Sequence, residues 1–306
     1  MTTLVFGHKA PDTDSTGSPL IWAWYLNEIK GIPARAVLLG EPNTEAAFVL
    51  KRWGIETPEI IADVEPGTKV VIVDTNNPAE LPASIDQADV QAIIDHHKLT
   101  GGLATKLPID ITIRPLACTA TLMHDLMGDD AAKMPDRIKC LMLSCILSDT
   151  LEFRSPTTTD HDRSLALSLA KDLDITIADY AEEMFAAKSD VSTLSDAELL
   201  RMDSKEYTVG GKALRISVME TTSPRAILDR KGSLMTAMDA VAQEDGADQV
   251  LLFVVDILRE EATLLVPNDL VRTIAEKSFG VSVSGDSVVL PGVMSRKKQI
   301  IPVLSV

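Results

Sequence analysis

The sequence predicts an α/β protein of two domains: a mostly parallel sheet with helices on both faces, followed by a smaller mixed α/β domain. The length of 306 residues exceeds the size at which one hydrophobic core keeps growing. Short aliphatic runs alternate with helix-type segments through the first half, a pattern typical of parallel sheets. We expect a first domain at 1–188, a Ser/Thr/Asp-rich linker at 189–195 and a second domain at 196–306.

The first domain is expected to combine short buried strands with amphipathic helices. Its apolar runs are three or four residues long and are bounded by polar or turn residues, as in a sheet that is covered on both faces. From about residue 118 to residue 188 the pattern becomes helical. The expected strands are 4–6, 36–39, 70–73 and 92–94, and the expected helices are 18–30, 43–53, 134–147 and 160–173.

The second domain repeats the mixture of strand and helix signals after the polar linker. Its longest apolar run, 250–255, has the length of one buried strand. The other expected strands are 213–219, 262–266 and one near the end, and the expected helices are 234–242 and 269–277.

Composition and charge exclude several functional classes. Hydrophobic residues make up 45% and charged residues 24%, which is typical of a folded protein. A formal net charge of -16 disfavours a protein that tracks nucleic-acid backbone, because that function needs a broad positive surface. The net charge does not exclude a small anionic substrate, because bound divalent cations can reverse the local electrostatic field inside one site. We expect no nucleic-acid partner.

The N-terminus and the cysteines indicate a reducing compartment. Residues 1–8 lack the basic start and long apolar stretch of a secretory signal, and no apolar run is long enough to cross a bilayer. Cys118, Cys140 and Cys145 are an odd number beside apolar stretches, with no thiolate metal spacing. We expect reduced core cysteines and a cytoplasmic protein without a membrane partner.

Imidazole and carboxylate side chains follow several apolar segments. Singly, each aspartate is more often a cap or turn residue, and a histidine pair can be one buried and one exposed side chain. Together they suit Mn-, Co- or Mg-like ions better than structural zinc, and two ions held close together need a bridging carboxylate and flanking ligands. We group four clusters as strand-end residues: His8, Asp12 and Asp14; Asp74; His96 and His97; and Asp149, which follows the apolar segment 141–147.

Five motifs in this order resemble a known family. The segments 7–14 (GHKAPDTD), 74–75 (DT), 95–97 (DHH) and 148–150 (SDT) are similar to the four motifs of the DHH phosphoesterases. The segment 295–299 (SRKKQ) resembles the C-terminal motif of the family II, manganese-dependent inorganic pyrophosphatases. The resemblance extends over essentially the whole chain, and no regulatory insertion separates the domains.

The resemblance implies a centre of two metal ions per subunit, Mn²⁺ or Co²⁺, with Mg²⁺ accompanying the substrate. It assigns His8, Asp12 and Asp74 to one ion. It assigns Asp14, His96 and Asp149 to the other, with Asp74 bridging both. It also implies a homodimer.

The resemblance further implies hydrolysis of pyrophosphate to two phosphates by a hydroxide that bridges the metals, in a cleft between the domains. His97 would contact substrate and assist proton transfer to the leaving group. Lys205, Arg296 and Lys297 of the second, DHHA2-type domain would bind the phosphates. The alternative for Lys205 is a solvated surface lysine, and for 295–298 a nucleic-acid or localisation patch, which needs a longer basic run.

Two other functions remain open at this point. One is another DHH enzyme, an exonuclease, oligoribonuclease or exopolyphosphatase. The nucleases usually carry a glycine-rich motif in their second domain, whereas this chain has only Gly210–Gly211, and its 4% aromatic content leaves few platforms for bases. The other is a regulatory module that has lost activity, although every matched metal and phosphate residue is present. His124 and His161 match no motif and are expected to be ordinary helix residues.

Overall fold

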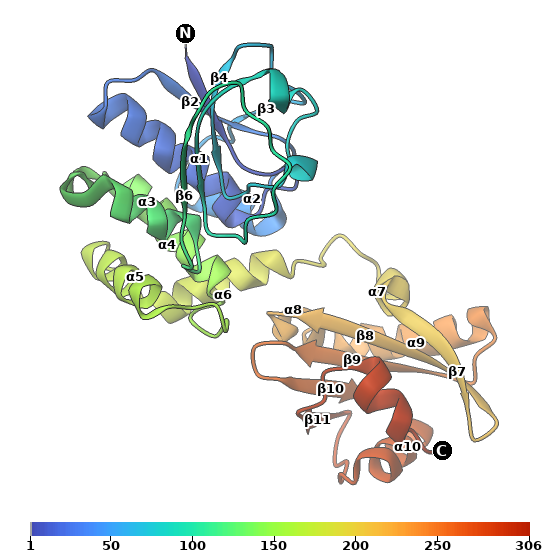
Figure 1. Cartoon of the computed structure of the whole chain (residues 1–306). Helices are drawn as coiled ribbons and strands as arrows, with labels where there is room; N and C mark the ends of the chain where they lie inside the picture. Colours follow the sequence, from blue (N-terminus) through green and yellow to red (C-terminus); the bar gives the residue numbers. More distant parts are fainter. Residues whose placement is uncertain (1) are drawn as a thin grey trace. The chain divides into compact units, whose positions relative to one another are not determined.

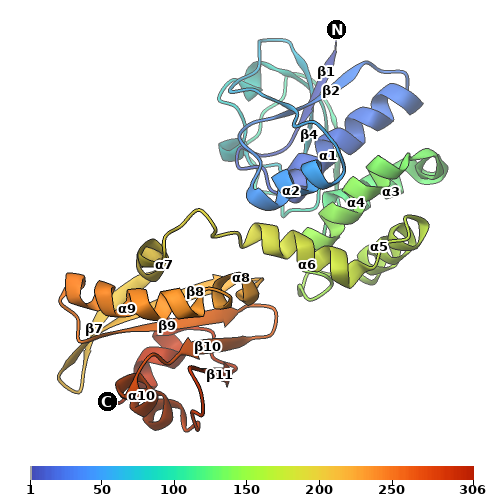
Figure 2. The same ribbon diagram turned by 180° about the vertical axis from the view of Figure 1, so that it is seen from behind.

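The computed structural model describes residues 2–306 and divides into two compact units, Met1–Lys188 and Ser189–Val306. Each unit is an α/β structure with its own sheet (Figures 1 and 2). The polar segment 189–194 follows the last helix of the first unit, and Ser195 caps the first helix of the second.

The first unit is built on a six-stranded parallel sheet with the order β3-β2-β1-β4-β5-β6. The four expected strands are confirmed, and two edge strands were not expected. The edge strands lack an apolar run: Glu59 and Ile60 of β3 are both exposed, as are Asp110 and Ile111 of β6. The strands are β1 (Thr3–Phe6), β2 (Ala34–Leu38), β3 (Glu59–Ile60), β4 (Lys69–Val73), β5 (Asp89–Asp95) and β6 (Asp110–Ile113).

The α-helices of this unit all contribute to the core on one face of the sheet, where they pack around Val5, Val73 and Ile94. On the other face, Leu81 and Ile85 from the short 3₁₀ turns η2 and η3 cover the strands. Helices on both faces were expected, but the connection from β4 to β5 has prolines and supplies only these turns. The elements are α1 (Thr13–Trp24), η1 (Tyr25–Ile29), α2 (Thr44–Arg52), η2 (Pro78–Glu80), η3 (Ile85–Gln87), α3 (Thr119–Met127), η4 (Gly128–Lys133), α4 (Asp136–Asp149), α5 (Asp160–Asp172) and α6 (Ile177–Lys188).

Two helix boundaries differ from the sequence expectation in ways that matter for the site. Helix α1 begins at Thr13 rather than at residue 18, because Asp12 caps it by accepting a hydrogen bond from the backbone nitrogen of Ser15 at 3.0 Å. Helix α4 continues to Asp149. Asp149 therefore lies at the end of a helix, and its grouping with strand-end residues was wrong.

The second unit contains a mixed sheet with the order β11-β10-β9-β8-β7, in which only β8 and β9 pair in parallel. Every residue of the central strand β9 is buried, because one core packs α7 and α9 on one face and another packs α10 on the other. The elements are α7 (Asp196–Met202), β7 (Ser204–Val209), β8 (Lys212–Thr221), α8 (Pro224–Leu228), α9 (Lys231–Asp245), β9 (Gln249–Asp256), β10 (Glu261–Leu265), α10 (Asp269–Phe279), β11 (Ser287–Pro291), η5 (Arg296–Ile300) and η6 (Ile301–Val303).

The cysteines are buried, as the apolar stretches around them predicted. Cys118, Cys140 and Cys145 are buried and unbridged. Within residues 2–306 no helix is long and apolar enough to cross a membrane.

Close packing of α1 on α4 gives a testable constraint on the fold. A Cβ atom added at Gly17 of α1 would lie 2.4 Å from the Sγ atom of Cys145 on α4. We expect Gly17→Ala to lower the free energy of unfolding by about 1–3 kcal/mol, because the core would be overpacked. Adding Cys145→Ala removes the clashing atom and should recover much of that loss. Urea denaturation of both single variants and the double variant measures the effect, and equal losses in Gly17→Ala and the double variant would contradict it.

Candidate metal centre

The predicted ligands come from loops and helix ends around the carboxyl ends of three adjacent strands. His8 follows β1, Asp74 follows β4, and His96 follows β5, and these strands are neighbours in the sheet. The start of α1 and the end of α4 supply the remaining carboxylates. Within the described chain, the candidate ligand atoms form three overlapping groups, with all atoms of a group within 4.8 Å of one another: His8, Asp12 and Asp74; Asp14, His96 and Asp149; and Asp74, His96 and His97.

Asp74 belongs to two of these groups, and its two carboxylate oxygens face different histidines. Oδ2 is 3.5 Å from Nε2 of His8, and Oδ1 is 3.4 Å from Nε2 of His96. Its backbone has φ of 57°, the left-handed region that costs a non-glycine residue about 1–3 kcal/mol. The backbone nitrogen of Asp74 still donates to the oxygen of Ile94 on β5 at 3.0 Å. The sheet therefore holds Asp74 in the conformation that turns its side chain between the histidines.

The entry into α1 requires a glycine after β1. A Cβ atom at Gly7 would lie 2.0 Å from Oγ of Ser15. That oxygen instead accepts a hydrogen bond from the backbone nitrogen of His8 at 2.8 Å. The bond fixes the His8 backbone against the first turn of α1, beside Asp12.

The carboxylates of Asp14 and Asp149 are buried but differ in their partners. Asp14 accepts hydrogen bonds from Oγ of Ser18 and from the backbone nitrogen of Thr119, both at 2.7 Å. Asp149 Oδ2 is buried without a hydrogen-bond partner in the described chain. A buried carboxylate oxygen without a donor is costly, and a cation beside it removes the cost. This unpartnered oxygen is the feature that fits a bound metal ion best.

The two histidines of the DHH triplet have different surroundings. Nδ1 of His96 donates to the carbonyl oxygen of Leu116 at 3.1 Å, which leaves Nε2 toward Asp74. Nδ1 of His97 bonds Oδ1 of Asp95 at 2.9 Å, and 53% of the His97 side chain is exposed. His97 also lies near Asp74, with Nδ1 3.8 Å from Oδ1, but that nitrogen is already committed to Asp95. The geometry favours His96 as the ligand and His97 as the outward-facing residue.

Several supporting residues were not identified from the sequence. Oδ1 of Asp95 accepts from the backbone nitrogens of His96 and His97 at 2.8 and 3.0 Å, and Oδ2 accepts from Asn76 at 2.5 Å. Asp95 opens the DHH triplet, so its place in the motif was a usable signal. Thr119 had no such signal, because it reaches Asp14 and Asp74 only through the fold; its Oγ1 donates to Asp74 at 3.1 Å.

Protonation of the centre reflects the balance between burial and opposite charge. Burial acts to raise the pKa of Asp74, but hydrogen bonds from His8 and His96 hold it well below its usual range. Burial acts to lower the pKa of both histidines, yet bonds to Asp12 and Asp74 raise that of His8 to about 10, and the bond to Asp74 raises that of His96 to about 9. The histidines are thus cationic at neutral pH when no metal competes with the protons.

The remaining carboxyl groups are shifted the other way. Burial, reinforced by the charge of Asp74, raises the pKa of Asp14 to about 6. Burial and the neighbouring carboxylates raise the pKa of Asp149 well above its usual range. Burial and Asp14 also raise the pKa of the Cys118 thiol, so this nearby sulfur remains protonated and is a poor ligand. The donor set is imidazole and carboxylate, which suits Mn²⁺ or Co²⁺.

The predicted phosphate-binding residues all belong to the second unit. Arg296 begins η5, and its guanidinium donates to the backbone oxygen and to Oδ1 of Asp203 at 2.9 and 2.7 Å. Lys205 is exposed on β7, two residues beyond Asp203, and the exposed Lys297 follows Arg296. Arg296 is therefore tied to the segment that leads into Lys205.

His124 and His161 lie on helices, as expected, and in none of the groups that could hold a metal ion. His124 is on α3. His161 is on α5, and its Nε2 is 2.7 Å from Oδ1 of Asp125.

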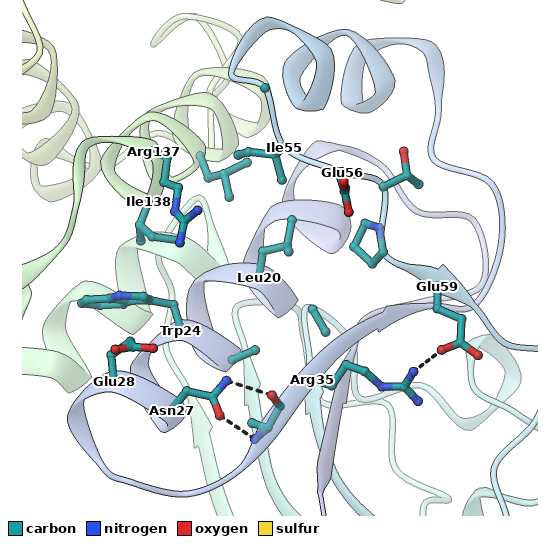
Figure 3. A pocket seen from close by; sticks show the side chains of 17 residues that line it. Leu20, Trp24, Asn27, Glu28, Arg35, Ile55, Glu56, Glu59, Arg137 and Ile138 are labelled. Atoms are coloured by element: carbon teal, nitrogen blue, oxygen red, sulfur yellow. Dashed lines mark hydrogen bonds and ion pairs between the residues drawn. The ribbon is translucent and has the colours of Figure 1, made fainter.

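Figure 3 shows a hollow of about 710 Å³ in the first unit that contains none of the predicted site residues. Several of its polar groups are already paired: Arg35 with Glu59, and the Asn27 side chain with the backbone of Ala34. A hollow of about 470 Å³, by contrast, is lined by His8 and His97 and adjoins the metal centre. The chemistry therefore points to the smaller hollow.

Comparison with known proteins agrees with the motifs. Residues 2–148 match the DHH family N-terminal domain, and residues 182–306 match the DHHA2 domain. The chain is thus a DHH protein with a DHHA2 domain. A protein of Deinococcus radiodurans, named a probable manganese-dependent inorganic pyrophosphatase, is 40% identical over 98% of this chain and 96% of its own. The manganese-dependent inorganic pyrophosphatase of Methanocaldococcus jannaschii is 35% identical over 98% and 97%.

A solved structure leads to the same family. The crystal structure of a candidate family II inorganic pyrophosphatase from Methanococcus jannaschii is 34% identical, covers 98% of this chain and 97% of its own, and has a TM-score of 0.61. The chain belongs to the family of manganese-dependent inorganic pyrophosphatases.

The raised histidine pKa values give a prediction for metal binding. A metal ligand must be a neutral imidazole, so Mn²⁺ must displace the protons held by His8 (pKa about 10) and His96 (pKa about 9). We expect release of at least about two protons per protein near neutral pH, because Asp149, whose pKa is also raised, can add to the two from the histidines. The apparent Mn²⁺ affinity should rise with pH until it passes the histidine pKa values. Calorimetric titrations in buffers of different ionisation enthalpy count the protons.

A distant histidine provides the control for that titration. His161→Gln, which removes the partner of Asp125, should leave the proton count unchanged, whereas His96→Gln should reduce it. Binding of Mn²⁺ without proton release, or with an affinity independent of pH, would contradict the charge state derived for the centre.

Proposed function

We propose that this chain hydrolyses inorganic pyrophosphate to two phosphates with two divalent metal ions, Mn²⁺ or Co²⁺, and with Mg²⁺ bound to the substrate. The observation that carries the proposal is the position of Asp74, whose two oxygens face His8 on one side and His96 on the other. A carboxylate shared in this way is what a pair of closely spaced cations requires. The choice of pyrophosphate as the substrate rests on the relatives, which are named inorganic pyrophosphatases.

The proposed ligand sets follow from two of these side-chain groups, with Asp74 added to the second because its Oδ1 lies 3.4 Å from Nε2 of His96. His8, Asp12 and Asp74 would hold one ion, and Asp14, Asp74, His96 and Asp149 the other. When bound, the ions would supply positive charge for the phosphoryl oxygens and would lower the pKa of water, which would make hydroxide available near neutral pH. The chain then needs no side-chain nucleophile.

His97 is proposed to act on the leaving phosphate. Its Nδ1 is bonded to Asp95, so the ring orientation is fixed and the exposed Nε2 is free to carry a proton. The bond to Asp95 raises the pKa of His97, which favours the protonated ring near neutral pH. In this form Nε2 can donate its proton to the oxygen that departs.

Lys205, Arg296 and Lys297 are proposed to bind the phosphates from the second unit. Arginine offers a planar fork to phosphate oxygens and lysine a point charge. Asp203 accepts from two nitrogens of Arg296, which restricts the rotation of the guanidinium. A preoriented arginine loses less entropy when substrate arrives.

We also propose a cytoplasmic homodimer. The edge strand β6, with Ile111 54% exposed, supports association of two copies, because an uncovered edge is a natural pairing surface.

The proposed activity is tested by phosphate release from pyrophosphate. We expect turnover of pyrophosphate with Mn²⁺, loss of turnover after chelation, and recovery with Mn²⁺ or Co²⁺ rather than Ca²⁺, because Ca²⁺ prefers longer bonds and more oxygen ligands. A dinucleotide and a longer polyphosphate, assayed beside it, should be poor substrates. If the dinucleotide or the polyphosphate were cleaved faster than pyrophosphate, the proposed pyrophosphatase activity would be wrong and another DHH activity would take its place.

Two classes of variant separate metal binding from phosphate binding in the same assay. Asp74→Asn should lose both metal and activity, because a neutral amide cannot offset two adjacent cations. Arg296→Ala and Lys297→Ala should retain metal but lower kcat/KM by about 10²-fold or more each, since charge stabilisation of the transition state is removed. Metal content is measured beside kcat/KM. Full metal content and rate in Asp74→Asn, or metal loss in Arg296→Ala, would overturn the assignment.

A further inference from the structure

The hollow beside the metal centre is bounded by the loops that follow β1, β4 and β5. It has a volume of about 470 Å³ and is lined by His8, Lys9 and Ala10, by 75–77 with Ala79 and Glu80, and by His97, Lys98 and Thr100. His8 and His97 belong both to the metal centre and to this wall. A ligand in the hollow therefore lies next to any metal ions bound there.

Lys98 is carried on a backbone that Asn76 holds in place. Nδ2 of Asn76 donates to the carbonyl oxygen of Lys98 at 3.1 Å, and Oδ1 of Asn76 accepts from the backbone nitrogen of Thr100 at 2.8 Å. Asp95 fixes the preceding residue through the backbone nitrogen of His97. Among residues 2–306 no partner is found for the Lys98 ammonium. The backbone position of Lys98 is therefore fixed, and its ammonium, on a flexible side chain, is free to bind an anionic ligand.

Lys9 enters the same hollow from the β1–α1 loop. Its backbone nitrogen donates to the oxygen of Glu80 at 3.0 Å. Its carbonyl oxygen lies against Gly40, where an added Cβ atom would be only 2.4 Å away. The Lys9 ammonium makes one long hydrogen bond, 3.4 Å, to the oxygen of Ala79. That single weak contact leaves most of its hydrogen-bonding capacity free.

The charge of the lining is positive in a strongly acidic protein. Of the described residues that line the hollow, Glu80 alone is a carboxylate, and its Oε2 already accepts a hydrogen bond from Oγ1 of Thr75 at 2.6 Å. The lining therefore has two lysines, Lys9 and Lys98, against one carboxylate, whereas the whole chain carries a formal net charge of -16. A local cationic hollow of this kind attracts small anions.

We propose that Lys98 and Lys9 form a phosphate-binding subsite on the first unit, separate from Lys205, Arg296 and Lys297. The proposal rests on the proposed pyrophosphatase activity and adds two substrate-binding residues to it. Lys98 is the principal contact because its ammonium has no competing partner, and Lys9 is the secondary one. The subsite holds one phosphate group of the substrate, or the phosphate product, beside the metal ions.

The experiment compares the Mn²⁺-loaded wild-type chain with Lys98→Gln, Lys9→Gln and the double variant. We expect Lys98→Gln to lower kcat/KM for pyrophosphate roughly tenfold, mainly through KM, and the double variant to lower it further. Inorganic phosphate should inhibit these variants more weakly than wild type. Lys98→Arg should recover most of the loss, because the positive charge remains.

Lys69→Gln is the matched control. Lys69 opens β4, the strand that Asp74 follows, so it lies roughly 15 Å along the strand from the centre, beyond the Debye length at physiological salt. It should keep wild-type kinetics. Mn²⁺ content must stay at the wild-type level in the Lys98 and Lys9 variants, which separates lost phosphate binding from a damaged metal site.

The outcomes distinguish this proposal from the proposed function. A wild-type chain that is inactive on pyrophosphate would refute the function itself. An active wild type with a double variant of unchanged kcat/KM and unchanged inhibition by phosphate would refute the subsite alone. Failure of Lys98→Arg to recover activity, or loss of Mn²⁺ in Lys98→Gln, would show a structural role for Lys98 and would also overturn the subsite.

Discussion

The metal centre of the first unit depends on one carboxylate, that of Asp74, which lies between two histidines. Its two oxygens face two imidazoles from different strands, and three further aspartates lie around them. Gathering so many carboxylates in a buried place is unfavourable unless positive charge lies among them. In the metal-free state protons on the histidines supply that charge, as their raised pKa values show. Metal ions would replace those protons with a larger charge.

The rest of the first unit holds this arrangement in place. Three local features strain the backbone or bring two elements close together. Asp74 has a left-handed backbone, Gly7 lies against Ser15, and Gly17 lies against Cys145. Such features are costly in isolation, and the surrounding sheet and helices stabilise them. Thr119, on a different helix, contributes its backbone nitrogen and hydroxyl to two of the buried aspartates. The centre is thus formed by the tertiary packing of β1, β4, β5, α1, α3 and α4 together.

Residues that are adjacent in the sequence have different hydrogen-bond partners at the centre. His96 and His97 are adjacent in sequence, but one is oriented by the carbonyl of Leu116 and the other by Asp95. Asp95 itself is held by Asn76, which also holds the backbone of Lys98. One hydrogen-bonded network therefore orients a candidate ligand, a candidate proton donor and a candidate phosphate contact. Changes at Asn76 or Asp95 would affect all three.

The sequence by itself determined the features that depend on local chemistry. Short aliphatic runs predicted the central strands, because buried parallel strands are apolar throughout, and 250–255 predicted β9 in the same way. Residue types and spacing named the candidate metal ligands, and the family resemblance selected six of them. The edge strands β3, β6 and β7 escaped detection, because they are partly exposed and carry no apolar run.

The tertiary structure decided what depends on distant contacts. It placed Asp149 at the end of α4 rather than of a strand, left one face of the first sheet with only short 3₁₀ turns, and brought Thr119 to Asp14 across 105 residues of sequence. It also gave His96 and His97 different hydrogen-bond partners. Such relations follow from packing and hydrogen bonds between elements far apart in the chain, and no local pattern of residues records them.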